Sequence, residues 1–310
     1  MAHTPRVVIG VPVYNGENYL RQALESIENQ TFTDFKVIIS DNASTDSTPA
    51  ICREFVERDS RFTYYRQPEN IGGAPNFNFA FQPGSSPYFK WAAHDDVMAP
   101  DYLRQCVERL DADPSLSMVH SRSTTIDKQG NPIGTYDREL RLNGEKPSDR
   151  FWRILWVVHY TEVFGVMRSD MIANTQMHPS VVGSDRHFMT EMVLQGDIGY
   201  VEDYLFLRRH HPESFCNALK NNQARLQWFD PKAKASTLFA SPRKFKEYII
   251  SIFRIEMPWH QRVACLWMLV EWTGRRGIES AFGLGDSYRK KLMAANKVSN
   301  SVAHSTQASS

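Results

Sequence analysis

Two adjacent carboxylates, Asp95 and Asp96, follow the short and mostly apolar run Lys90–Ala93. A buried strand that delivers paired aspartates at its carboxyl end is a common way to hold a divalent cation against a phosphate. The run Lys36–Ser40 ends in the same manner, at Asp41. Because parallel strands end at the same edge of a sheet, these acids predict a nucleotide site at that edge.

Apolar patterning predicts the elements that position these acids. Residues 7–13 are almost uninterruptedly apolar, as in a parallel strand buried on both faces. Residues 36–41 and 62–65 have similar strand character, while apolar side chains recur at helical spacing in 19–27 and 51–56. This alternation of strands and helices is the signature of a doubly wound, mostly parallel α/β sheet.

The later elements are predicted in the same way. A helix begins near Pro100, residues 117–126 form a strand, and a second helix runs from Arg186 to about Gln195. The polar residues 134–150 predict a mobile loop.

The composition excludes several classes of protein. With 310 residues, 42% of them apolar, and a formal net charge of +1, the chain is an ordinary globular protein and not a dedicated nucleic-acid binder. Its four cysteines form no CxxC pair, which indicates neither a zinc site nor a disulfide framework. The N-terminus has no apolar signal segment, and the apolar run Val263–Val270 is too short to cross a bilayer. We therefore expect a cytoplasmic protein, soluble or peripheral on the inner face of a membrane.

Six short motifs, each weak alone, occur in one order along residues 6–215. They are Val11–Glu17, Ser40–Asp46, Glu69–Gly72, His94–Asp96, Gly183–Asp185 and Arg209–Ser214. Together they resemble the family 2 glycosyltransferases with a GT-A fold. The resemblance implies an inverting, metal-dependent enzyme that moves a sugar from a nucleotide-diphospho-sugar, preferably linked to UDP or dTDP, to a hydroxyl acceptor. It also implies a glycan or glycolipid acceptor in bacterial polysaccharide or glycolipid synthesis.

The resemblance divides the chain into parts. Residues 1–215 would form the catalytic domain, with a donor half at about 6–127 and an acceptor half at about 128–215. Residues 216–293 would form a helical extension, and the Ser- and Asn-rich residues 294–310 a disordered tail.

The resemblance also assigns the nucleotide contacts. They are Pro12, Tyr14, Glu17, Asp41, Asn70, Asp95 and Arg209. Asp41 would accept the imide N–H of uracil or thymine; alternatively, it caps the turn that follows. Arg209 would hold a phosphate, and Asp95 would reach the ribose or a metal-bound water.

Asp96 and His211 are the residues assigned to Mg²⁺ or Mn²⁺. Such a cation would neutralise charge on the departing nucleoside diphosphate. Many relatives have a further acid at the position of Ala93, so this chain has fewer candidate ligands. The alternatives are that the acids cap the helix near Pro100 and that His211 is a polar loop residue.

Asp185 matches the family's general base, which takes the proton of the acceptor hydroxyl. Its alternative is to cap the helix that begins near Arg186. Glu162, in an apolar setting, is a weaker rival for the base.

Two other classes of function are alternatives to a glycosyltransferase. A nucleotide-dependent oxidoreductase is disfavoured because no GxGxxG follows the first strand. A catalytically silent nucleotide- or glycan-binding protein is favoured only by Ala93.

Aromatic side chains at helical spacing mark the C-terminal part, mixed with arginines. Trp259, Trp267 and Trp272 are examples. These helices pack on the catalytic domain or on another subunit, or they contact a membrane interface beside a lipid-linked acceptor. The pattern does not choose between these alternatives.

Overall fold

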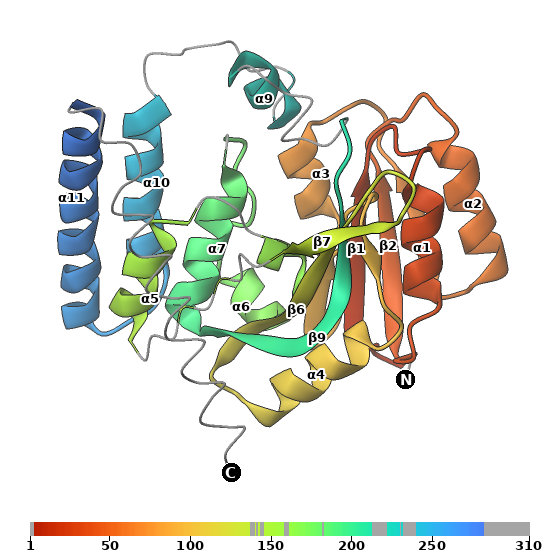
Figure 1. Cartoon of the computed structure of the whole chain (residues 1–310), viewed down its shortest axis with the longest axis horizontal. Coiled ribbons are helices and arrows are strands. Elements are labelled where there is room, and N and C mark those ends of the chain that lie inside the picture. Colours follow the sequence, from red (N-terminus) through yellow and green to blue (C-terminus); the bar gives the residue numbers. More distant parts are fainter. Residues whose placement is uncertain are drawn as a thin grey trace.

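A curved sheet with helices on both faces forms the centre of the chain (Figure 1). The computed structural model describes residues 3–136, 140, 142, 146–157, 161–181, 183–212, 222–229, 231 and 240–281. Within these residues the strands are β1 (Val7–Val13), β2 (Phe35–Asp41), β3 (Phe62–Arg66), β4 (Tyr88–Trp91), β5 (Val97–Met98), β6 (Leu116–Ile126), β7 (Pro132–Tyr136), β8 (Val166–Arg168) and β9 (Asp197–Arg209).

The strands follow the order β3-β2-β1-β4-β8-β6-β9-β5, and β7 pairs with β6. Strands β1 to β4 are parallel to one another, and β9 is parallel to β6. Because β8 is antiparallel to both β4 and β6, all six of these strands end at one edge, which we call the carboxyl edge. The predicted mixed α/β fold with a mostly parallel sheet is confirmed.

The helices are α1 (Leu20–Glu28), α2 (Thr48–Arg58), α3 (Gly73–Phe79), α4 (Tyr102–Ala112), α5 (Pro147–Ile154), α6 (Ser169–Ala173), α7 (Ser184–Gln195), α9 (Asn222–Phe229), α10 (Ala240–Arg254) and α11 (Trp259–Ala281), with a 3₁₀ turn η1 (Thr161–Phe164). Side chains of β1 alternate between two cores. Val7, Ile9 and Val11 pack with α1, α2 and α4, whereas Val8 shares the other core with α7.

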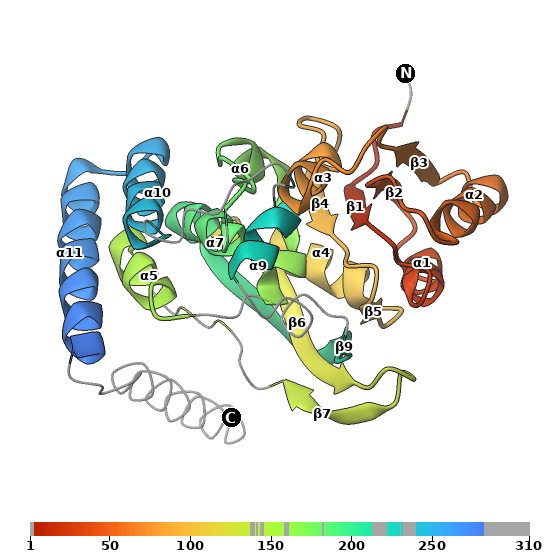
Figure 2. The same ribbon diagram turned by 90° about the horizontal axis from the view of Figure 1, so that it is seen from above.

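A third core joins α5, α7, α10 and α11 at one end of the molecule (Figure 2). Phe151 of α5, Leu194 of α7, Tyr248 of α10 and Leu269 of α11 are all buried in it. Glu191 of α7, fully buried, also lies 3.4 Å from Arg254 of α10. Among the described residues, no helix combines the length and apolar character needed to cross a membrane.

The prediction of a loop over residues 134–150 is wrong at both ends. Strand β7 pairs with β6 as far as Tyr136, and α5 begins at Pro147. Leu140 and Leu142 are buried, so apolar side chains anchor this polar stretch to the core. The predicted disordered tail, residues 294–310, lies outside the described residues.

Candidate active site

The acids that follow β4 meet the end of β9 at the carboxyl edge. The His211 ring donates from Nε2 to Oδ2 of Asp95 at 2.8 Å, across 116 residues of sequence. Asp96 Oδ1 instead accepts the backbone N–H of Arg209 at 2.9 Å. The two neighbouring acids are therefore held by different groups.

The Arg209 side chain fastens three segments to the end of β9. Its guanidinium donates to the carbonyl oxygens of Asp95, Asp127 and Lys128 and to Oε1 of Gln22, at 2.7–3.3 Å. Arg209 is buried, with 3% of its surface exposed. Because its donors are directed to these oxygens, the geometry does not favour the phosphate contact suggested by the sequence.

The pKa values of Asp95 and Asp96 are shifted in opposite directions. Burial acts to raise the pKa of Asp95, but the hydrogen bond from His211 and the neighbouring His94 lower it overall. Burial and the charge of Asp95 raise the pKa of Asp96 to about 7. Two acids this close cannot both ionise at low cost without a nearby cation.

The geometry pairs His211 with Asp95 and not with Asp96. Asp96 instead accepts the Arg209 N–H, and the prediction that Asp96 and His211 share a cation stays a prediction. The carboxylate oxygen is a ligand for Mn²⁺ or Mg²⁺, whereas the imidazole nitrogen, once its proton is lost, suits Mn²⁺ better than Mg²⁺. The described residues contain no group of three or more His, Cys, Asp or Glu side chains arranged as a metal site.

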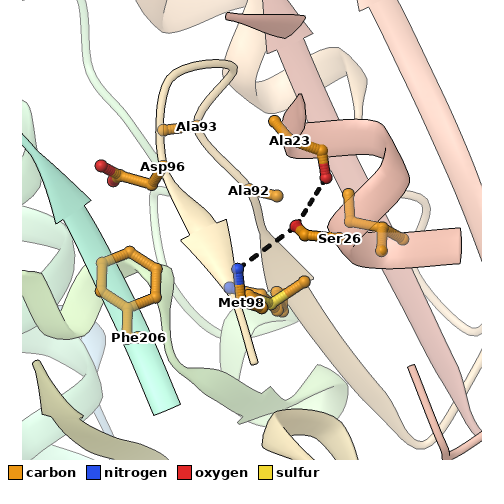
Figure 3. A pocket seen from close by; sticks show the side chains of 9 residues that line it. Ala23, Ser26, Ala92, Ala93, Asp96, Met98 and Phe206 are labelled. Carbon is orange, nitrogen blue, oxygen red and sulfur yellow. Dashed lines mark hydrogen bonds between the residues drawn. The ribbon is translucent and has the colours of Figure 1, made fainter. Parts of the chain in front are cut away.

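Residues 92–96, which join β4 to β5 and carry Asp95 and Asp96, are here called the acid loop. A pocket lies behind the acid loop, between α1 and β9 (Figure 3). Asp96 lines it beside Ala92, Ala93 and Phe206. Lys90, fully buried, completes the lining; its Nζ donates to the carbonyl oxygens of Trp91 and Phe164. Burial lowers the pKa of Lys90 to about 7, opposed by Cys106 and Asp96. Ala93 lines this largely apolar pocket, so an acid at position 93, as in many relatives, would face the same pocket.

Two aromatic neighbours of these acids were not predicted as site residues. The Tyr19 ring lies 4.8 Å from the His211 ring, edge to face, and 4.6 Å from the Arg209 guanidinium carbon. Periodicity indicated only that Tyr19 lies on the inner face of a helix. The His94 ring lies against Gly16, where a Cβ would come within 2.9 Å of it. Gly16 thus permits the loop after β1 to approach the acid loop.

The loops after β1 and β2 are bound to each other. Asn15 adopts a positive φ of 48°, and its side chain accepts the N–H of Thr45 at 2.9 Å. Glu17 accepts the N–H of Ser47 through its carboxylate, and its own N–H donates to Asp46, both at 3.0 Å. Glu17 therefore has a visible structural role, and its predicted nucleotide contact stays a prediction.

Asp41 lies at the end of β2 and is fully buried. One carboxylate oxygen accepts the N–H of Ser44 at 2.8 Å, and the other accepts the Tyr64 hydroxyl at 2.7 Å. The turn-capping alternative is thus present in the structure. A contact to a nucleobase stays a prediction, and it would require Tyr64 to move or to share the oxygen.

The remaining residues predicted on the nucleotide side occupy the same edge. Pro12 is buried within β1, and Tyr14, just beyond its end, is 44% exposed. The Asn70 side chain accepts from the N–H of Gly72 and from the amide of Asn42, both at 2.9 Å. Asn70 thus closes the turn before α3, and Tyr14 supplies the exposed ring of this set.

Asp185 lies in the first turn of α7 and is half-buried. Gly183, in the left-handed conformation, occupies the N-cap position, so Asp185 is not the N-cap residue, although its side chain still bonds to an N–H of the first turn. Its Oδ1 accepts the N–H of Arg186 at 2.9 Å. In Figure 1, α7 descends from the carboxyl edge before β9 climbs back to it, so Asp185 lies at the end of α7 that faces this edge.

Glu162 is enclosed and unsuited to meet an acceptor. It is 1% exposed, and its Oε1 accepts the N–H of Leu140 at 2.8 Å and the Tyr200 hydroxyl at 2.5 Å. These contacts anchor the segment before α5. Between the two candidate bases, exposure favours Asp185.

Several known sequences are similar to this chain. Residues 8–174, more than half of the chain, match the model of the family described as Glycosyl transferase family 2. Chondroitin synthase from Escherichia coli is 34% identical over 134 residues, which cover 43% of this chain and 19% of the relative. The putative glycosyltransferase EpsH from Bacillus subtilis is 27% identical over 209 residues, covering 67% of this chain and 56% of the relative. The chain thus spans well under two thirds of these relatives.

Solved structures share the fold at low identity. S. aureus TarS 1–349 in complex with UDP-GlcNAc aligns with a TM-score of 0.64 and 16% identity, covering 87% of this chain and 72% of that one. The mannosyltransferase PcManGT from Pyrobaculum calidifontis, in complex with GDP-Man and Mn²⁺, aligns with a TM-score of 0.53 and 18% identity, covering 94% and 84%.

Proposed function

The chain belongs to glycosyl transferase family 2, and from this premise we propose that it transfers a sugar from a nucleotide-diphospho-sugar to a hydroxyl acceptor with inversion. The observation that carries the proposal is the contact between Asp95 and His211, which joins an acid after β4 to the end of β9 at the carboxyl edge. In open α/β sheets, ligands bind outside the carboxyl ends of the strands.

The donor would lie against this edge. TarS and PcManGT, which share the fold, were solved with UDP-GlcNAc and with GDP-Man and Mn²⁺. In this chain Asp95 and His211 would hold a divalent cation, with Asp96 beside them. A bound Mg²⁺ or Mn²⁺ would offset the charge of the diphosphate as it departs.

Asp185 is the proposed general base. It accepts the proton of the acceptor hydroxyl while the hydroxyl oxygen forms a bond to the anomeric carbon. The bond from that carbon to the diphosphate oxygen breaks, and the nucleoside diphosphate leaves with the electron pair. A single displacement of this kind inverts the anomeric configuration, and a well-placed base contributes about 10²–10⁴ in rate.

Tyr14 and Asp41 are the proposed contacts to the base. The exposed ring of Tyr14 is available to lie against a nucleobase, and a carboxyl oxygen of Asp41 is an acceptor for the imide N–H of uracil or thymine. This proposal favours UDP- or dTDP-linked donors.

The acceptor is proposed to be a glycan or a glycolipid of a bacterial surface polysaccharide. A relative named chondroitin synthase supports a polysaccharide product, because chondroitin is itself a polysaccharide. We infer that the reaction takes place on the cytoplasmic side, where nucleotide-sugars are made.

Calorimetric titration with UDP, dTDP, GDP and CDP, each with and without Mn²⁺, tests the donor site without knowledge of the acceptor. We expect UDP or dTDP to bind in a metal-dependent manner and CDP to bind more weakly. Binding of GDP alone would keep the transferase and reject the role of Asp41. If no nucleotide binds, the proposed function is wrong.

A further inference from the structure

One face of α11 is apolar and open to solvent. Trp259, Val263, Trp267 and Val270 are 75%, 55%, 71% and 58% exposed. Their spacing of four, four and three residues places them on one side of the helix, along about 16 Å of its length. We call these four residues the outer face of α11.

The opposite side of the same helix already serves the fold. Cys265 and Leu269 are buried in the third core, against α5 and α10. Both views show α11 at the outermost edge of the molecule, with α10 and α5 on its inner side (Figures 1 and 2). A surface helix that packs one apolar stripe normally turns a polar side to water, so packing among the residues that the structure describes does not account for the outer face.

Phe253, at the end of α10, adds to the exposed apolar area. Its ring is 59% exposed, and the Arg262 guanidinium carbon lies 5.7 Å from its centroid. Exposed aromatic groups with arginines close by are typical of a surface that sits at the boundary between water and lipid.

Charge distinguishes the possible occupants. Residues 240–281 contain seven Lys or Arg and four Glu, whereas the whole chain has a net charge of only +1. The formal net charge of this unit is therefore +3, so two copies of it would repel each other. An anionic surface would be attracted to it instead.

We propose that the outer face of α11, together with Phe253, binds the surface of an anionic lipid bilayer with α11 lying in the plane of the interface. Indole rings suit the headgroup layer because they combine an apolar body with an N–H donor. The binding itself is independent of the proposed function; only its consequence, access to a lipid-carried acceptor, rests on it.

Vesicle flotation tests the proposal with the full chain. The probes are vesicles of phosphatidylcholine alone and vesicles in which part of it is replaced by phosphatidylglycerol. We expect the protein to float with the anionic vesicles, and the double variant Trp259→Ser/Trp267→Ser to partition at least about tenfold less. Ile133→Ser is the matched control, because Ile133 is 57% exposed on β7, away from this face; it should float like the unchanged protein.

Two results would overturn the proposal. One is failure of the unchanged protein to bind anionic vesicles. The other is a dimer, seen by light scattering, that the double variant dissociates while vesicle binding is absent or unaltered; the outer face would then join two copies. UDP calorimetry on the variants verifies their folding, and failure of the unchanged protein to bind any of the four nucleotides would reject the proposed function without touching the vesicle result.

Discussion

The proposed donor half, at about residues 6–127, and the proposed acceptor half, at about residues 128–215, hold their aspartates in contrasting ways. In the donor half, Asp41, Asp95 and Asp96 are bound by groups from other segments, namely Tyr64, His211 and the Arg209 N–H. In the acceptor half, Asp185 accepts a hydrogen bond from the N–H of the next residue. The donor-half acids are therefore joined to residues of other segments, two of them in the proposed acceptor half, whereas Asp185 lies in the first turn of α7. Binding and turnover should therefore be separable by mutation.

The largest expected effect is on Asp185. Asp185→Asn should reduce turnover by about 10²–10⁴ because the amide cannot accept a proton, while UDP binding is unchanged. Steady-state kinetics and calorimetry on the same preparation measure both. The matched control is Asp170→Asn, since Asp170 in α6 also accepts the N–H of its successor at 2.9 Å. Near-full turnover in Asp185→Asn would reject the base and move attention to Glu162.

A smaller effect is expected from variants of Asp95 and His211, which are hydrogen-bonded to each other. Asp95→Ala and His211→Ala should each weaken Mn²⁺-dependent UDP binding by about 10–100-fold, because each removes one proposed ligand. Isothermal calorimetry with and without Mn²⁺ gives the ratio. His210→Ala is the control, because His210 is the exposed neighbour of His211. Equal losses in all three variants would show that the comparison of the two halves is misplaced.

Proton competition should be visible in the same titration. Burial and Asp95 raise the pKa of Asp96 to about 7, so without a cation Asp96 holds a proton below that pH. A bound cation favours the ionised form, and UDP–Mn²⁺ affinity should fall by up to about tenfold per pH unit below pH 7. Asp96→Asn cannot titrate and should give a shallower profile. A profile as steep as that of the unchanged protein would assign the titration to another group.

The smallest expected effect sharpens the role of Asp41. Tyr64→Phe removes the hydroxyl that donates to Asp41 Oδ2 and leaves this buried oxygen to the more distant Nε of Arg66, at 4.0 Å, at a cost of about 1–3 kcal/mol in the free energy of unfolding. If Asp41 binds the nucleobase, the freed oxygen should maintain or strengthen UDP binding. Chemical denaturation and calorimetry separate the two effects. Weaker UDP binding at unchanged stability would contradict this interpretation.

Much of the fold was predictable because it follows from local patterns. The spacing of Leu20, Ala23, Leu24 and Ile27 marks the buried side of α1, and the apolar run of residues 7–13 marks β1. Among the elements that the sequence did not predict, β7 and α5 adjoin a polar stretch in which the few buried leucines show no clear period.

The candidate site was predictable in composition but not in its pairings. The motifs named both Asp95 and Asp96, yet which of them meets His211 depends on how β9 reaches the acid loop. Strand β9 pairs with β6 in a register that shifts at Ser121 and Arg122. Hydrophobic periodicity contains no information on such shifts, so the partners of Arg209 could not be foreseen either.

The contact between Asp95 and His211 has a consequence for how the protein is made. The two residues are 116 positions apart. A ribosome that adds about 5–20 residues per second therefore adds Asp95 roughly 6–23 seconds before His211. During that interval β1 to β4 can assemble, but the acid loop lacks the hydrogen bonds from the His211 imidazole and from Arg209. The nascent chain therefore acquires its proposed cation site only when β9 is added, and a partly made chain should be unable to sequester metal there.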